Sequence, residues 1–93
     1  MKAAATFKTE QGARYLSSLC NHFGRKVKAT CTANDASIVF DFGRCDMVAH
    51  EGMLELIAQA PDQQGLDTVV EVMTRHLERF AFRENPHLEW CPT

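Results

Sequence analysis

The stretch VKATCTANDASIVFDFGRCDMVAHEGMLELIAQ, residues 27–59, decides the fold. Apolar residues recur at every second position along it, as Ile38, Phe40 and Phe42 do before Gly43 breaks the run. Such alternation is typical of half-buried strands. Because only short turn segments separate the runs, the pattern predicts four consecutive strands in an antiparallel meander. We expect these strands over residues 26–32, 38–42, 45–50 and 54–59.

A helical pattern precedes the meander. Its apolar positions recur at helical spacing and are Leu16, Leu19, Cys20 and Phe23. This spacing predicts a helix over residues 11–23 with one apolar stripe. Thr9 offers a hydroxyl to cap the helix N-terminus, and Gly24 stands where a left-handed C-cap would end it. Residues 3–8, before the helix, are expected to form a first strand.

A second helix follows the meander and is the clearest element of the sequence. Its apolar stripe consists of Leu66, Val69, Val70, Met73, Leu77 and Phe80. Asp62 stands just before this stripe, so we expect its carboxylate to cap the helix. Pro86 prevents the helix from continuing, and residues 87–91 are expected to form a last short strand.

These elements predict an α+β fold of the order β-α-β-β-β-β-α-β in one domain, residues 1–93. Each helix has one apolar stripe and most strands have one apolar face, so the elements should pack as a two-layer sandwich. Both helices are expected on one face of a six-stranded, mostly antiparallel sheet. The expected core contains Leu16, Leu19, Phe40, Leu56, Val70, Met73, Leu77 and Phe80.

Composition restricts the class of protein. The 93 residues carry a net charge of −2, which argues against nucleic acid as the main partner. No apolar stretch is long enough to cross a membrane, and the N-terminal residues lack the apolar core of a signal peptide. We therefore expect a cytoplasmic protein with no membrane partner, whose four Cys are reduced thiols.

Cys20, His22 and Cys45 form a weak candidate metal set, because thiolate and imidazole are the ligands that soft divalent metals prefer. The predicted topology places the end of the first helix and the Cys45 strand at the same end of the sheet. The alternative is core packing, since Cys20 and Cys45 both lie on apolar faces and a buried Cys behaves as a small hydrophobic residue. No Cys-x-x-Cys pair supports the metal interpretation.

Arg75, His76, Arg79 and Arg83 form the densest basic patch of the sequence. Arginines every fourth residue on a solvent-facing helix side can hold an anion through paired hydrogen bonds. The alternative is a solvated face in which cations complement the helix dipole and pair with Glu71 and Glu78.

A second basic group lies where the first helix ends, at His22, Arg25 and Lys26. Complementarity to the helix dipole accounts for it equally well.

Catalytic motifs are absent from the sequence. Ser17 and Ser18 lie in no nucleophile-elbow motif, and the separated glycines form no phosphate-binding loop. The sequence identifies no cofactor, and a catalytic role is less expected than a binding role. Val39, Val48 and Ile57 make the sheet face opposite the helices more apolar than solvent contact requires, which indicates a partner protein or a homodimer.

Four stretches resemble a bacterial domain-of-unknown-function family, number 2218: RYL at 14–16, LCNHF at 19–23, FGRC at 42–45 and HLERFAFRE at 76–84. The resemblance covers nearly the whole chain and implies no established activity. Some members resemble, or occur beside, siderophore-interacting reductases, which implies an iron-related association. The polar positions that the resemblance marks are Arg14, Cys20, His22, Cys45, His76, Arg79 and Arg83.

Together these observations favour a non-catalytic module that binds a protein or a small anionic ligand. Its candidate contact residues are Arg14, Arg75, His76, Arg79 and Arg83. The alternative function is an accessory domain in metal or iron–siderophore handling. The sequence names neither the ligand nor the oligomeric state.

Overall fold

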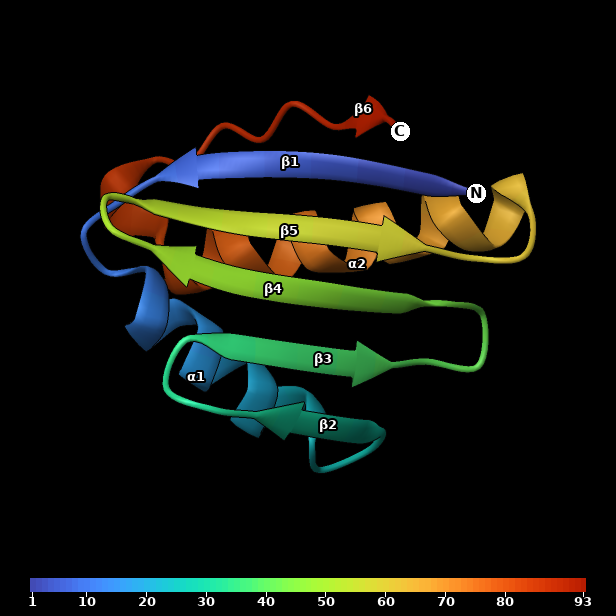
Figure 1. Cartoon of the computed structure of the whole chain (residues 1–93), viewed down its shortest axis with the longest axis horizontal. Coiled ribbons are helices and arrows are strands. Elements are labelled where there is room, and N and C mark those ends of the chain that lie inside the picture. The colour runs from blue at the N-terminus through green and yellow to red at the C-terminus, as the bar shows by residue number, and fades with distance from the viewer.

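A computed structural model describes residues 1–93 and confirms the predicted fold class. Its elements in chain order are β1 (Lys2–Lys8), α1 (Gly12–Phe23), β2 (Lys28–Cys31), β3 (Asp35–Val39), β4 (Arg44–His50), β5 (Met53–Gln59), α2 (Gln63–Phe80), the 3-10 helix η1 (Phe82–Glu84) and β6 (Cys91–Pro92). All strand pairs are antiparallel, in the order β2-β3-β4-β5-β1-β6. Both helices cover the same face of the sheet (Figure 1).

The N-terminal strand occupies an interior place in this sheet. β1 pairs with β5 along its whole length, with Ala5 opposite Leu56, and its other side pairs with β6. The meander β2 to β5 is therefore extended by the two ends of the chain (Figure 1). This arrangement leaves β2 at one edge and β6 at the other.

The core lies between the helices and the inner face of the sheet. The largest fully buried side chains are Leu16, Leu19, Ile38, Met47, Leu54, Leu56, Met73, Leu77, Val69 and Cys45. Three of the expected core residues differ. Phe80 is 37% exposed, because it ends α2 and packs against the His22 ring instead of the sheet. Phe40 and Val70 are only half-buried, and Phe40 stacks on Phe42 in the turn after β3.

Several strand boundaries also differ from the prediction. β2 covers only Lys28–Cys31, and β3 already begins at Asp35, three residues before the expected start. β3 ends at Val39, because the N–H of Phe40 donates to the carbonyl of Gly43 at 2.7 Å and closes a turn. The predicted last strand shrinks to Cys91–Pro92. Its earlier part lies against α2, where the Trp90 indole donates to the Thr74 hydroxyl at 2.8 Å.

The helix caps follow the sequence only for α2. The carboxylate of Asp62 accepts from the N–H of Gly65 at 2.8 Å, as predicted. The cap predictions for α1 were wrong. Its N-cap is Gln11. The Thr9 hydroxyl accepts from the N–H of Gln11 at 3.0 Å just before the helix begins, and it donates to Glu84. Gly24 has a right-handed φ of −61°, because the chain continues from α1 directly into a tight turn.

Candidate functional site

His22, Arg25, Lys26 and Arg79 gather at the C-terminal end of α1, and we call them the basic cluster. The backbone of the turn after α1 determines their arrangement. The N–H groups of Lys26 and of the following residue both donate to the carbonyl of Phe23, at 3.0 and 2.9 Å. This turn keeps Arg25 and Lys26 beside the last turn of α1, while Arg79 comes from α2.

Aromatic rings hold His22 between the two helices. Its ring centroid lies 5.0 Å from that of His76 and 5.6 Å from that of Phe80, and both residues belong to α2. His76 is itself fixed, because its Nδ1 lies 2.7 Å from the carbonyl oxygen of Val72 and donates to it. In a neutral His76 the free lone pair is therefore on Nε2.

The basic cluster carries an uncompensated positive charge. Loss of surrounding water lowers the pKa of His22, and the charges of His76, Arg25, Arg79 and Lys26 lower it further. None of the Lys and Arg side chains of the cluster takes part in an ion pair, since the ion pairs of the structure lie elsewhere. The C-termini of α1 and α2 each supply about half a negative charge, which leaves a surplus of cations.

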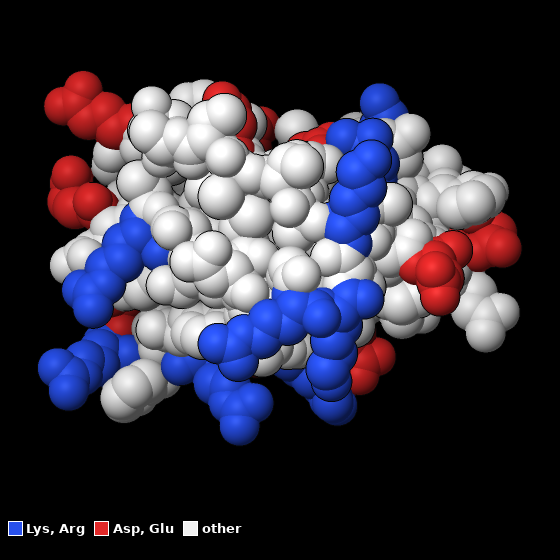
Figure 2. Space-filling model, turned by 90° about the horizontal axis from the view of Figure 1, so that it is seen from below, with Lys and Arg blue, Asp and Glu red and all other residues white.

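One face of the molecule, seen from below, is rich in Lys and Arg side chains (Figure 2). Lys and Arg side chains gather over its lower part, whereas most of the visible Asp and Glu side chains lie toward its ends (Figure 2). An anionic group reaching this surface meets several guanidinium and ammonium donors.

An open cleft of about 680 Å³ lies between the start of α1 and the end of α2. Arg14 and Arg83 line it, together with Tyr15, Phe82 and Glu84. The guanidinium carbon of Arg83 lies 5.9 Å from the centroid of the Phe82 ring, which is a cation–π distance. Phe82 is 68% exposed and leaves an apolar surface beside these charges.

Glu84 ties the wall of this cleft together. The Thr9 hydroxyl lies 2.8 and 3.0 Å from its two carboxylate oxygens, and the Tyr15 hydroxyl donates to it as well. The hydrogen bond to Glu84 raises the pKa of Tyr15, and burial and the carboxylate charge raise it further. Because Glu84 and Glu10 both line the cleft, its charge is mixed. The Lys and Arg side chains of the basic cluster, in contrast, form no ion pair with a carboxylate.

The structure divides the basic patch predicted from the sequence. Arg79 and His76 lie with His22, whereas Arg14 and Arg83 line the cleft. The predicted stripe does not continue to Arg83, because α2 ends at Phe80. Arg75 stands apart and pairs with Glu71 at 3.2 Å, with the two side chains 75% and 63% exposed. Arg75 therefore fits the alternative of a solvent-exposed helix face whose cations pair with neighbouring Glu side chains.

The candidate metal residues are not brought together. Cys20 and Cys45 are buried, and no group of three or more His, Cys, Asp or Glu side chains is arranged to hold a metal ion. Burial raises the pKa of Cys45 to about 12 and that of Cys20 to about 11, so both are thiols near neutral pH. The Cys45 thiol donates to the carbonyl of Asp46 at 3.7 Å. Both thiols lie in the core cluster, which fits the packing interpretation.

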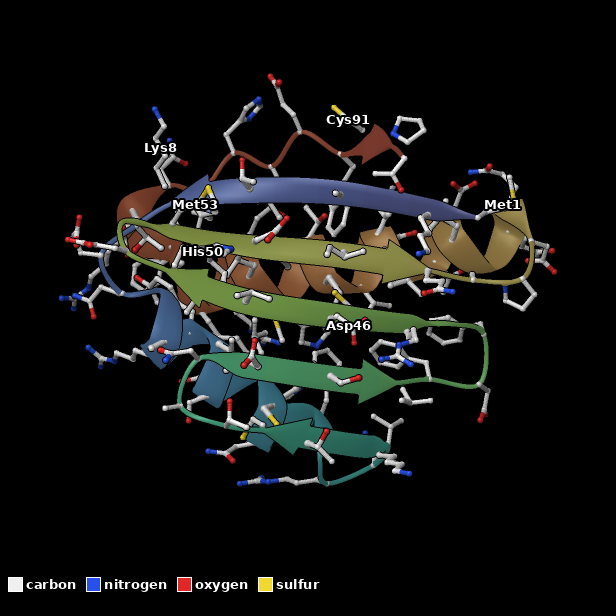
Figure 3. All side chains as sticks on the ribbon, viewed as in Figure 1. Met1, Lys8, Asp46, His50, Met53 and Cys91 are labelled. Atoms are coloured by element: carbon white, nitrogen blue, oxygen red, sulfur yellow. The ribbon has the colours of Figure 1, made fainter.

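The sheet face opposite the helices is open (Figure 3). Val39 is 40% exposed there, and Val48 and Ile57 are half-buried. Charged pairs interrupt this apolar surface, as where Arg44 meets Asp46 at 2.8 Å. A partner or second copy on this face stays a prediction. Neither helix has the length and hydropathy needed to cross a lipid bilayer.

Comparison with known proteins places the chain in a family. Residues 4–91 match the family described as an uncharacterized protein conserved in bacteria, DUF2218. The chain belongs to this family. It is also similar to PA4090 from Pseudomonas aeruginosa, whose structure was determined by NMR. The two structures superpose with a TM-score of 0.84, the sequences are 31% identical, and the match covers 98% of this chain and 95% of the PA4090 chain. No curated protein matches the sequence.

Membership of DUF2218 confirms the resemblance identified in the sequence. The residues of the basic cluster and of the cleft all lie within the matched range, 4–91. The family description supplies no activity, so the chemistry of these side chains is the remaining guide to function.

Proposed function

We propose that this DUF2218 protein is a non-catalytic binding module whose basic cluster holds the anionic group of a ligand. One observation carries the proposal. Arg25, Lys26 and Arg79 come from two separate parts of the chain, surround His22 and have no acidic partner. Unpaired cations brought together by the fold repel one another, and an anion removes that repulsion.

The ligand chemistry follows from the donors. A guanidinium offers two parallel N–H donors to a carboxylate or phosphate, and Arg25 and Arg79 each supply one such group. His22 adds a ring nitrogen, and its pKa rises when a bound anion stabilises the imidazolium form. The neighbouring Phe80 ring, 37% exposed, gives the apolar part of the ligand a surface to lie on.

Inorganic phosphate is the probe for a direct test. We expect phosphate to shift the ring resonances of His22 in an NMR titration and to raise its pKa, and we expect added KCl to weaken both effects. Arg79→Ala should abolish the phosphate response and by itself raise the pKa of His22, because one repelling charge is gone. The matched control is Arg75→Ala. Arg75 lies one turn away on the same helix, but its charge is already paired with Glu71.

The result that would overturn the proposal is equally specific. If Arg75→Ala and Arg79→Ala reduce phosphate binding equally, the response reports only general surface charge. If phosphate leaves His22 unchanged at low salt, the cluster is no anion site. If phosphate does bind at His22, titrations with aryl carboxylates and with an acidic peptide compare the affinity of the cluster for a small ligand and for a protein partner.

The alternative function in metal or iron–siderophore handling predicts a different response. Because Cys20, His22 and Cys45 are not arranged around a common point, a free metal ion is not the species that such a role would use. A ferric complex with an anionic chelator would instead meet the basic cluster. Titration with that complex and with the iron-free chelator decides whether iron adds anything beyond charge.

A further inference from the structure

Cys20 lies on α1 and Cys31 on β2, two elements that pack against each other. The turn at residues 24–27 sends the chain back beneath the helix, and a Cβ placed at Gly24 would lie 3.7 Å from the Cβ of Ala29. Cys20 lies four residues before Gly24, which is about 6 Å along the helix axis. Cys31 lies two residues after Ala29, which is about 6.6 Å along the strand. Because the helix and the strand run in opposite directions, these similar lengths place Cys20 and Cys31 at the same level.

The electrostatics of Cys20 agree with this placement. Burial raises the pKa of Cys20, and the neighbouring Cys31 side chain raises it further. Cys20 is 4% exposed, whereas Cys31 is exposed at the edge of the sheet. A reagent in solution therefore reaches Cys31 first and finds Cys20 behind it.

The other two thiols are not placed to compete within the same molecule. Cys45 is buried on β4 and bonded to the Asp46 carbonyl. Cys91 lies on β6, at the opposite edge of the sheet from β2 (Figure 3). A disulfide needs sulfurs about 2.05 Å apart, so the helix or the strand must shift for the bond to form. β2 has four residues and a single strand neighbour, β3, so little structure opposes that movement.

We propose that Cys20 and Cys31 are a dithiol site that a hydroperoxide converts into a reversible intramolecular disulfide. The Cys31 sulfur, as thiolate, attacks the peroxide and the O–O bond breaks. Cys31 becomes a sulfenic acid, and the leaving hydroxide or alkoxide takes a proton from the solvent to become water or an alcohol. The Cys20 sulfur then attacks the Cys31 sulfur, and the departing hydroxide takes the Cys20 proton as water. Two electrons pass from the two thiols to the peroxide, so the reaction balances.

The order of these steps follows from the surroundings of each sulfur. Burial raises the pKa of Cys20 to about 11, so Cys20 remains a thiol and is a poor first nucleophile. It acts once the sulfenic acid forms beside it, because the leaving hydroxide supplies the base. A disulfide reductant or excess thiol reverses the bond by exchange.

The test is peptide mapping of the folded protein after treatment with hydrogen peroxide. Free thiols are alkylated and the chain is digested with trypsin, which separates the two cysteines by cleaving at Arg25, Lys26 and Lys28. We expect a cross-linked pair of peptides, lighter than their sum by two hydrogen atoms, that dithiothreitol separates. Cys91→Ser should leave this product unchanged and Cys31→Ser should abolish it.

Because Cys20 is buried, Cys20→Ser can disturb folding, and the decisive variants are therefore the two exposed ones. Cys20→Ser, where it folds, should accumulate the Cys31 sulfenic acid, trapped by dimedone. The proposal fails if the native chain stops at a Cys31 sulfenic acid. It also fails if the main product is an intermolecular disulfide, with Cys20 still free for alkylation after denaturation.

Discussion

Replacing Gly65 by Ala should destabilise the protein, although Ala favours helices more strongly than Gly by about 1 kcal/mol. Gly65 lies in the first turn of α2. A Cβ at this position would lie 2.4 Å from the carbonyl oxygen of Phe42, 3.1 Å from the capping oxygen of Asp62 and 3.2 Å from the Cβ of Ala60. Real Cβ atoms do not approach a backbone oxygen this closely, so the helix start and the turn after β3 must separate.

The magnitude follows from two opposing effects. Overpacking a tight contact costs about 1–3 kcal/mol, and weakening the Asp62 cap costs about 1 kcal/mol more. Subtracting the helix preference leaves a net loss of about 1–3 kcal/mol in the free energy of unfolding. Gly12→Ala is the control, because the nearest atom to its new Cβ is 3.4 Å away, an ordinary contact. We expect Gly12→Ala to change stability by no more than about 1 kcal/mol, in the stabilising direction.

Urea unfolding followed by circular dichroism measures both variants. The expected result is a lower midpoint for Gly65→Ala and an equal or higher midpoint for Gly12→Ala. A Gly65→Ala protein at least as stable as the unmodified chain would refute the reasoning. It would mean that the added methyl group fits beside the Phe42 carbonyl oxygen without displacing the helix start.

Three further predictions concern single side chains. Tyr15→Phe removes the hydrogen bond to Glu84 and should lower the free energy of unfolding by about 1 kcal/mol, measured in urea below pH 8. The same loss of stability measured above the pKa of Tyr15, where its hydroxyl no longer carries a proton to donate, would contradict this explanation. Asp62→Ala should cost about 1 kcal/mol and Asp62→Asn less, since Asn keeps the cap. The lowered pKa of His22 means that the unfolded chain binds the proton more tightly, so thermal stability should decline as pH falls below the ordinary His value of 6.5. A pH series of melting temperatures should show a smaller decline for His22→Gln, and an unchanged slope would rule out this residue as the cause.

The sequence correctly predicted those helices and strands that are specified by residues close together in the chain. The apolar stripe of α2 and its Asp62 cap both lie within one segment, so their positions were predicted correctly. The exposure of Phe80 could not be read from the same stripe, because it depends on where the last turn of α2 stands relative to α1. Gly24 was misinterpreted for a similar reason, since a glycine at a helix end can serve a turn without a left-handed φ.

The candidate site was predicted only in pieces. Arg79 was identified on α2, and Arg25 and Lys26 were identified after α1, each with an adequate explanation from the helix dipole. What joins them is the packing of α1 against α2, which brings the His22 ring to 5.0 Å from His76. Side chains distant in sequence carry no periodic signal of such a meeting, so this grouping required the three-dimensional fold.

The interior place of β1 has a consequence for how the chain folds. Its pairing partner β5 follows roughly fifty residues later, and loops of that length close more slowly than the turns of the meander. The hairpins β3–β4 and β4–β5 can form from neighbouring residues, but β5 then presents an unpaired side until β1 arrives. We therefore expect β1 to dock late, after the meander, and mutations in its buried Ala5 to accelerate unfolding more than they slow folding. Stopped-flow kinetics of Ala5→Gly would measure the two rates, and a substantial slowing of folding would instead place β1 in the nucleus.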